Sequence, residues 1–494
     1  MFFISVEFII FLIILFPLYF SCLNKYKWIL LLIASYIFYS FASIKYLIFL
    51  LITTISTYFA SLYIENLHFK EIKLTNGSNL NQKEIKNIQI KKNLCLIITI
   101  IINIGMVFSF KQISFISDNF NLSNILNLAL PLGISYYTLQ SLSYVIDVYR
   151  KNIKSEKNIA KYALFVSFFP QFVMGPISRF DDLSFQLFNK YSFNKDIFIQ
   201  GVQRIVWGFF KKLVIADRIG LFVDLIYADY SNHSGMVLVI TILLYSIQIY
   251  ADFSAYMDIA VGVSKCLGIK IQENFNVPYF SKSVQEFWTR WHITLYTWFR
   301  DYVFFSLLRS NLFIKLRAIL YKKNFFISSL PITICIMVVW LLTGLWHGIQ
   351  LHYIVASLYN GVLIVLCLFV QKYNIFKKVN NLVKIICTFI LISFGHFIFK
   401  ISTLKDAMNI INKIIESPFS NNIFSELNIG MFDVSQWCVV IMSIIVLFIV
   451  DYIKAKNKYN NINIKIRLFI TYLLVLSIVF FGKFGATTFI YLGF

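Results

Sequence analysis

Two histidines occupy positions in which a polar ring is costly. His347 lies in "LLTGLWHGIQ" and His292 in "FWTRWHITLY", and each directly follows a tryptophan. A neutral imidazole can take a proton from a hydroxyl and return it, which is general acid–base chemistry. Apolar surroundings favour this neutral form, because burial disfavours the imidazolium. Each ring is either a buried structural residue or part of a paired site, and the local sequence leaves both interpretations open.

The segment 273–307 around His292 mixes aromatic with charged residues. Glu286 and Arg290 stand four residues apart, so they can pair on a helix. Arg300 and Asp301 are adjacent; we expect them to point in different directions and to find different partners. This composition suits the headgroup interface or the wall of a polar cavity, rather than a span exposed to lipid.

The remaining histidines and the cysteines carry little chemical signal. His68, His233 and His396 are interpreted as structural. His347 and His352 are five residues apart, so they do not share a helical face as i,i+4 metal ligands do. HExxH, calcium-loop and GxSxG patterns are not found, and the seven cysteines are scattered without a CxxC. We therefore predict no metal site and no serine nucleophile.

The composition predicts an all-α, polytopic membrane protein. Of the 494 residues 59% are hydrophobic and only 14% charged, against about 25% charged in soluble domains. The net charge of +22 does not indicate nucleic-acid binding, because the basic residues cluster in short segments between apolar stretches. These segments, expected to be cytoplasmic loops, are 66–92, 150–161, 309–323, 372–384 and 454–467. The apolar stretches suggest ten to thirteen membrane-embedded helices in one domain, 1–494.

Polar and helix-breaking residues interrupt the apolar frame in two further places. Asp252 and Asp258 lie inside an apolar run, so we expect each carboxylate to be buried with a partner. Pro170, Gly175 and Pro176 break the helix in 169–180. Irregular backbone at membrane depth is tolerated only where protein packs it or where it lines a cavity.

The segment 403–434, expected outside the cytoplasm, contains "TLKDAMNIINKIIES" with apolar residues at helical spacing. This predicts a surface helix that packs on the bundle; an interfacial helix or a partner-docking site is the alternative.

Six blocks together resemble the membrane-bound O-acyltransferase family, especially its branch that acetylates bacterial polysaccharides such as alginate and peptidoglycan. The blocks are "PLGISYYTLQSLSYVIDVYR", "FPQFVMGPISRF", "FFKKLVIADRI", "IQIYADFSAYMDIAVG", "ENFNVPYFSKSVQEFWTRWHITLYTWFRDYVFF" and "GLWHG", within a core of about 130–400. The relative that transfers D-alanine to teichoic acid shares several of them. The stretch "LRSNLFIKLRAILYKK" after Leu307 departs from the acetylation branch, which leaves the branch open.

The resemblance implies a ring of helices around a central funnel, with His347 as the catalytic histidine and His292 as a second functional one. We expect His347 to deprotonate the acceptor hydroxyl and His292 to position or polarise a substrate. Trp288, Trp291 and Trp346 would line an acyl path. Arg300 and Asp301 are further candidates for orienting substrate.

The same resemblance implies an acyl thioester, acetyl-CoA or an acyl carrier, as a substrate from the cytoplasm, and no bound cofactor. It also implies an extracytoplasmic acyl-transfer partner protein, a surrounding of membrane lipid, and residence in the bacterial cytoplasmic membrane. The alternatives are D-alanyl transfer to teichoic acid and, in another class, a transporter or flippase. No two halves with matching broken segments are found, which argues against the transporter.

Overall fold

The computed structural model describes residues 3–42, 44–76, 82–119, 131–374, 376–420, 422–430, 432–456, 463–485 and 489–490. In these ranges the protein is helical, with one isolated β-bridge between Phe275 and Trp291. Eight described helices are long and apolar enough to cross a membrane, within 44–76, 82–111, 235–266, 330–347, 351–372, 381–400, 434–455 and 464–481. The all-α, multi-pass fold class is confirmed, while the total of ten to thirteen embedded helices and the ring arrangement stay predictions.

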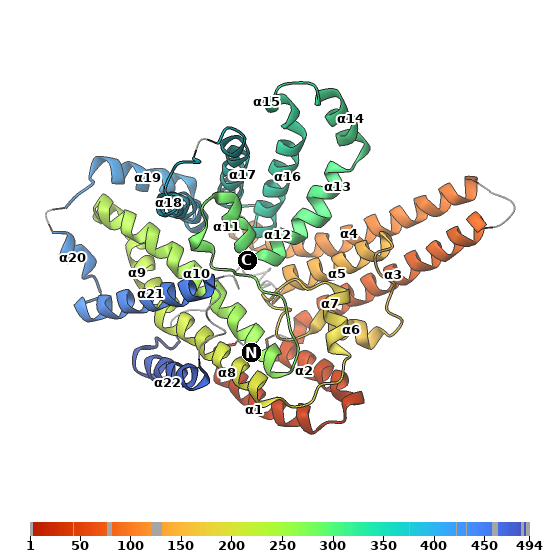
Figure 1. The fold of residues 1–494 in the computed structure, drawn as a ribbon, viewed down its shortest axis with the longest axis horizontal. Coiled ribbons are helices and arrows are strands. Elements are labelled where there is room, and N and C mark those ends of the chain that lie inside the picture. The colour runs from red at the N-terminus through yellow and green to blue at the C-terminus, as the bar shows by residue number, and fades with distance from the viewer. Residues whose placement is uncertain are drawn as a thin grey trace. The chain divides into compact units, whose positions relative to one another are not determined.

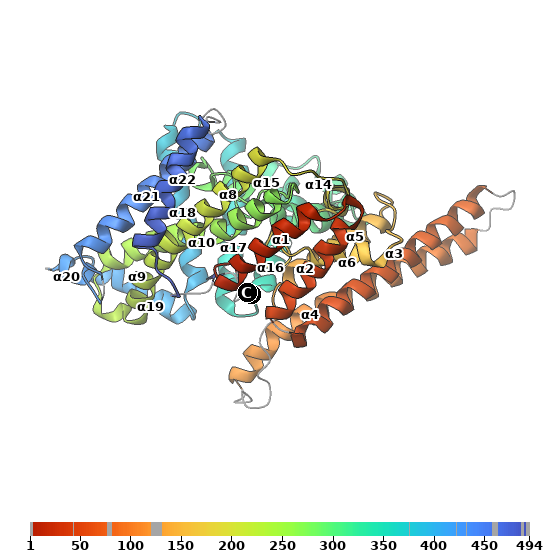
Figure 2. The same ribbon diagram turned by 90° about the horizontal axis from the view of Figure 1, so that it is seen from below.

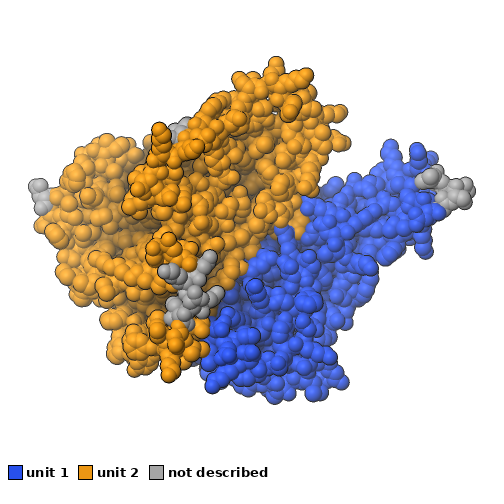
Figure 3. All heavy atoms as spheres, in the orientation of Figure 1, with its two compact units in different colours: residues 1–202, 260–272, 493 blue, residues 203–259, 273–492, 494 orange. Residues whose placement is uncertain are grey.

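The chain divides into two compact units, shown in Figure 3. Unit 1 comprises residues 1–202, 260–272 and 493, and unit 2 comprises residues 203–259, 273–492 and 494. Two helices, α8 (Lys195–Phe210) and α10 (Gly235–Cys266), have residues in both units. His292 and His347 both belong to unit 2.

Unit 1 is built around a long helical hairpin, α3 and α4, which lie side by side in Figures 1 and 2. Its helices are α1 (Val6–Ser21), α2 (Lys27–Ala42), α3 (Leu47–Asn76), α4 (Gln82–Asn119), α5 (Ile134–Tyr149), α6 (Ile159–Ser167) and α7 (Phe180–Leu187). The expectation of a basic loop over 66–92 is therefore wrong, because helix continues to Asn76 and resumes at Gln82. Lys, Glu and Gln are good helix formers, and Glu71 pairs with Lys92 at 3.1 Å and with Lys151 at 2.9 Å.

The predicted helix break between α6 and α7 is confirmed, and protein packs it. Residues 168–178 are buried and non-helical. Gln171 donates to Gln140 Oε1 at 3.1 Å and accepts from Ser178 Oγ at 2.9 Å. The side chains of Gln171 and Ser178, which the break brings inside, thus have hydrogen-bond partners within the protein.

Unit 2 carries the remaining helices and two π-helical stretches. The helices are α9 (Asp217–Ala228), α11 (Val284–Arg290), α12 (Ile293–Phe299), α13 (Phe305–Leu308), α14 (Asn311–Leu320), α15 (Phe325–Ser328), α16 (Leu330–His347), α17 (Leu351–Lys372), α18 (Asn381–Lys400), α19 (Leu404–Glu416), α20 (Ile423–Leu427), α21 (Val434–Ala455) and α22 (Ile464–Phe481). The π-helical stretches are Lys211–Ala216 and Arg300–Phe304. Short 3-10 turns occur in unit 1 at 24–26 and 44–46, and in unit 2 at 230–232 and 278–280.

The surface helix expected in 403–434 is confirmed as α19. It begins after Thr403, whose side chain accepts from the Asp406 N–H. It buries Ala407 and Ile410 and leaves Met408 and Ile415 exposed, so the helix packs on unit 2 and keeps part of its apolar face open.

Candidate active site

Unit 2 contains a cavity of about 70 Å³ between α11, α12, α16, α17 and α18, with one residue of α10. Its lining residues are Ile249, Trp288, Trp291, His292, Leu295, Tyr296, Phe299, Val339, Trp340, Thr343, His347, Ala356, Ser357, Asn360, Gly395, His396 and Phe399. No Asp, Glu, Lys or Arg occurs among these described residues. The cavity is therefore an aromatic and aliphatic chamber into which two candidate catalytic imidazoles project.

His347 is the last residue of α16, at a point where two glycines permit close packing. A Cβ on Gly344 would lie 3.0 Å from Ile354 Cα and 3.1 Å from Tyr353 O, both on α17. Gly348 ends the helix, and its N–H donates to Gly344 O at 3.1 Å. The sequence "GLWHG" thus places an imidazole at a helix end that is pressed against the next helix.

The His347 ring lies among other rings but is not sealed. Its centroid is 4.7 Å from that of Trp346, 4.9 Å from that of Phe399 and 6.3 Å from that of Tyr353. The residue is only partly buried, and it lines the cavity. A substrate in the cavity can therefore reach the imidazole.

His292 is held in an unusual backbone conformation between α11 and α12. Its φ of 46° and ψ of 49° lie in the left-handed region, which non-glycine residues rarely adopt. The neighbouring segment fixes this turn: Ile293 N–H donates to Asn274 O and Asn276 N–H donates to Arg290 O, both at 3.0 Å. Backbone strain of this kind costs of order 1–3 kcal/mol and gathers at functional sites.

Burial keeps the His292 ring neutral. The side chain is almost fully enclosed and meets Phe253 edge-on, with ring centroids 4.8 Å apart. Desolvation lowers the pKa of His292 to about 3. At neutral pH the ring is uncharged, so it can position a substrate through hydrogen bonding but cannot act as a fixed positive charge.

We expect the stability of the protein to fall as the pH drops below about 6.5, partly because of His292. An unfolded histidine binds a proton near pH 6.5, whereas the folded His292 resists protonation until about pH 3, so acid favours unfolding. His292→Phe should flatten the dependence by up to about 1.4 kcal/mol per pH unit. Thermal unfolding of both proteins in detergent between pH 7.5 and 5 measures this; parallel curves would contradict a neutral buried ring.

The three tryptophans of the expected acyl path take two different positions. Trp288 and Trp291 line the cavity, and Trp288 packs edge-on against Trp340 at 4.6 Å. Trp346 is not among the lining residues; its ring centroid lies 4.7 Å from that of His347 and 6.4 Å from that of His292. Trp346 therefore packs against the two histidines without lining the cavity itself.

Arg300 and Asp301 do not face the cavity. The expectation that they find different partners is wrong, since Arg300 Nε donates to Asp301 Oδ1 at 2.8 Å. They begin a π-helical stretch, and the long arginine side chain folds back onto its neighbour. Both are about a third to a half exposed and neither lines the chamber. By contrast, Arg290 and Glu286 form the expected i,i+4 pair, at 2.6 Å.

The cavity also contains residues that the sequence did not single out. His396 of α18 was interpreted as structural, and Asn360 of α17 was not considered, yet both are buried on its wall. The available signal was a polar residue inside an apolar run, "SFGHFIF" for His396. It lacks the preceding tryptophan that marks His292 and His347.

Asp252 and Asp258 have the buried partners that were expected of them. Asp252 accepts from Lys212 at 2.7 Å; Asp258 pairs with both Arg204 and Lys211 at 2.6 Å. The Asp258 pairs border a second, smaller cavity of about 60 Å³ in unit 2. Because Asp252 and Asp258 both face cationic groups, these contacts form a buried ion-pair network.

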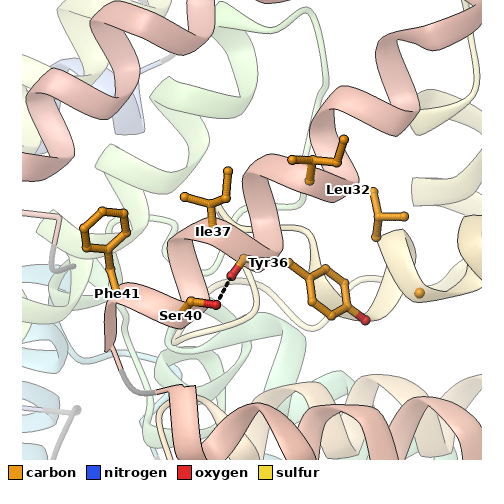
Figure 4. A pocket seen from close by; sticks show the side chains of 7 residues that line it. Leu32, Tyr36, Ile37, Ser40 and Phe41 are labelled. Carbon is orange, nitrogen blue, oxygen red and sulfur yellow. Dashed lines mark hydrogen bonds between the residues drawn. The ribbon is translucent and has the colours of Figure 1, made fainter.

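Unit 1 has an open groove along α2, shown in Figure 4, but it offers little chemistry. Leu32, Ile33, Ile37 and Phe41 form most of its wall, and the Ser40 hydroxyl is taken by the Tyr36 carbonyl at 2.8 Å. None of the described lining residues is an imidazole, carboxylate or ammonium group. Likewise, the described residues contain no group of three or more His, Cys, Asp or Glu side chains that could hold a metal ion.

Comparison with known proteins gives a consistent assignment. The model of the membrane-bound O-acyltransferase family matches residues 83–403. A probable alginate O-acetylase of Pseudomonas aeruginosa is 33% identical over 430 residues, which are 83% of this chain and 74% of the relative. The peptidoglycan O-acetyltransferase of Helicobacter pylori is 31% identical over 368 residues, 67% of this chain and 62% of the relative. The teichoic acid D-alanyltransferase of Bacillus subtilis is 30% identical over 289 residues, 55% of this chain and 69% of the relative.

Proposed function

Because the chain belongs to the membrane-bound O-acyltransferase family and is an O-acyltransferase, we propose that it moves an acetyl group from a cytoplasmic thioester toward hydroxyls of an extracytoplasmic polysaccharide. The observation that supports this most directly is the chamber in unit 2, where His292 and His347 share one cavity without a charged lining residue. The apolar lining disfavours a charged imidazolium at His292, and a neutral imidazole is the form that acyl transfer to an alcohol needs.

His347 is the proposed base. Its neutral imidazole takes the proton of the acceptor hydroxyl as the oxygen attacks the thioester carbonyl and forms a tetrahedral intermediate. The carbon–sulfur bond then breaks, the ester forms, and the departing thiolate takes the proton from the His347 imidazolium. His292, fixed by its strained turn, positions the substrate by a hydrogen bond.

The lining of the cavity favours an acetyl over a D-alanyl group. A D-alanyl ester carries an ammonium group, and an ammonium buried without an anionic partner is strongly disfavoured. The described lining residues provide no carboxylate for it. The comparisons agree, since the acetylating relatives match 83% and 67% of this chain and the D-alanylating one 55%.

The remaining parts of the proposal follow from topology and family resemblance. Basic segments on the cytoplasmic side would attract an anionic donor such as acetyl-CoA or an acyl carrier. A second, extracytoplasmic protein would complete delivery to the polymer, with the segment 403–434 as its contact, where α19 leaves Met408 and Ile415 exposed. The bacterial cytoplasmic membrane is the location that this direction of transfer requires.

We expect a strain without this chain to lose acetyl esters from one envelope or secreted polysaccharide and to keep its D-alanyl esters. Cell wall, teichoic acid and exopolysaccharide are purified separately, and acetate and D-alanine released by mild alkali are quantified. Re-expression of the chain should restore the acetate. Loss of D-alanine with unchanged acetate would instead assign the chain to teichoic acid modification.

A further inference from the structure

The N-terminal end of α12 is capped by a residue from another part of the chain. A residue at the N-cap position usually satisfies the first helical N–H groups with its own side chain. His292 holds that position in α12, but its side chain makes no capping hydrogen bond. The cap is supplied instead by Asn274, which lies in the segment that precedes α11.

Asn274 accepts three hydrogen bonds from the residues that follow His292. Its backbone oxygen accepts from Ile293 N–H at 3.0 Å. Its side-chain Oδ1 accepts from Thr294 N–H at 3.0 Å and from the Thr294 hydroxyl at 2.6 Å. Because a backbone N–H can only donate, the oxygen and not the nitrogen of the amide faces Thr294. One asparagine thus satisfies the first two N–H groups of α12.

Asn274 is itself held in place by contacts with two neighbouring helices. It is fully buried, and its Nδ2 donates to Met257 Sδ of α10 at 3.2 Å. The preceding residue, Glu273, accepts two hydrogen bonds from the Arg204 guanidinium of α8, at 2.7 and 2.6 Å. The oxygens that cap α12 therefore belong to a segment that is anchored on both α8 and α10.

This cap determines the direction of the His292 side chain. The left-handed backbone of His292, with φ of 46°, is unfavourable for a residue with a Cβ, so it persists only where neighbouring bonds hold it. A right-handed or extended backbone would turn the Cα–Cβ bond and move the imidazole out of the cavity that it now lines together with His347. Because Asn274 supplies the cap, the imidazole is not needed for that task and can face the cavity.

We propose that Asn274 is a positioning residue of the transfer reaction: by capping α12 in place of His292, it holds this histidine in the left-handed conformation that directs the imidazole into the chamber. The inference rests on the proposed function for the task of His292, which is to place a substrate. Asn274 does not line the cavity itself, so its effect on transfer passes through His292.

The first test follows the backbone of His292 by solid-state NMR and needs no substrate. The full chain in lipid bilayers is labelled with ¹³C,¹⁵N-histidine, and the His292 signals are those missing from His292→Phe. In Asn274→Ala the Cα and Cβ shifts of His292 should move to right-handed or extended values, while the signals of the other histidines stay in place. Unchanged His292 shifts would overturn the proposal.

Thr294→Val is the milder variant for the same measurement. It keeps the shape of the side chain and removes one of the three hydrogen bonds to Asn274, so the His292 shifts should move in the same direction by a smaller amount. If Asn274→Ala disturbs every histidine signal, Thr294→Val decides: His292 shifts that remain those of the wild-type protein would then overturn the proposal.

The second test asks whether the loss of transfer passes through His292. Asn274→Ala should lower kcat for acetyl transfer about 10- to 100-fold where His292 is present, the effect of a small displacement of a positioned group, and by less than about 2-fold in the His292→Ala background. Thr294→Ser, which keeps the hydroxyl, should retain the activity that Thr294→Val loses. An equal loss from Asn274→Ala in both backgrounds would show a general structural role and overturn the proposal.

Asn103→Ala is the matched control for the loss of a buried asparagine. Asn103 is also fully buried, but it lies in unit 1 and donates to Ser56 Oγ at 3.1 Å and Thr99 O at 2.9 Å. Its replacement should leave the His292 signals unchanged and kcat within about 2-fold. A wild-type protein that transfers no acetyl group would reject the proposed function, while the NMR shifts would still decide whether Asn274 holds His292.

Discussion

Replacing His347 with alanine should lower acetyl transfer by about 100- to 10,000-fold while the protein remains folded in the membrane. The range is the contribution of a positioned general base. His347 lies at the end of α16, lines the chamber and is only partly buried, so truncation removes the proton acceptor without opening a large hole in the core. The measurement is acetate released from purified cell-wall material and exopolysaccharide, normalised to the amount of tagged protein in the membrane.

Two companion variants separate this effect from general damage. His347→Gln keeps hydrogen bonding and approximate size but cannot accept the proton at neutral pH, so it should be as inactive as the alanine variant. His233→Ala changes a histidine that does not line the cavity and should retain most activity. Unchanged acetylation by His347→Ala at normal protein levels would reject the catalytic role.

Much of this architecture follows from patterns that act over short distances. The apolar composition predicts a polytopic helical protein, and the helical spacing in 403–416 predicts α19. The breakers Pro170 and Gly175 mark a real interruption between α6 and α7. Burial of Asp252 and Asp258 with cationic partners follows from the cost of an unpaired carboxylate in an apolar frame. In each case the local sequence strongly favours one conformation or one kind of partner.

Features that depend on contacts between distant segments could not be predicted. The left-handed backbone of His292 is held by two hydrogen bonds, from Ile293 N–H to Asn274 O and from Asn276 N–H to Arg290 O. The local sequence "TRWHIT" does not predict this conformation. His396 lines the chamber where α18 approaches α17 closely, since a Cβ on the preceding Gly395 would lie 3.1 Å from Asn360 Nδ2. Arg300 and Asp301 were grouped with the site by their sequence neighbours, but the π-helical turn places them outside the cavity wall.

Removing Asp258 should destabilise the protein by about 3–5 kcal/mol, the cost of leaving a buried charge without its partner. Asp258 accepts from Arg204 and Lys211, both at 2.6 Å, and Lys211 is 4% exposed. Arg204 keeps Glu273 as a partner in Asp258→Ala, but Lys211 loses its closest carboxylate. Burial lowers the pKa of Lys211 to about 8 even with Asp258 present, so removal of this carboxylate should lower the pKa further. Thermal unfolding in detergent, followed by the loss of the monodisperse peak, measures the change.

A double variant shows whether the loss is due to the orphaned charge or to the cavity. Lys211→Met added to Asp258→Ala removes both charges and fills space with an apolar chain, so it should recover at least half of the stability. Asp224→Ala is the control for an ordinary ion pair: Asp224 is 52% exposed and Lys400 lies at 2.7 Å, so the change should be within about 1 kcal/mol. If Asp258→Ala changed stability as little as Asp224→Ala, the network would contribute little to stability. Its buried charges would then have to be retained for another reason, such as contact with the anionic donor.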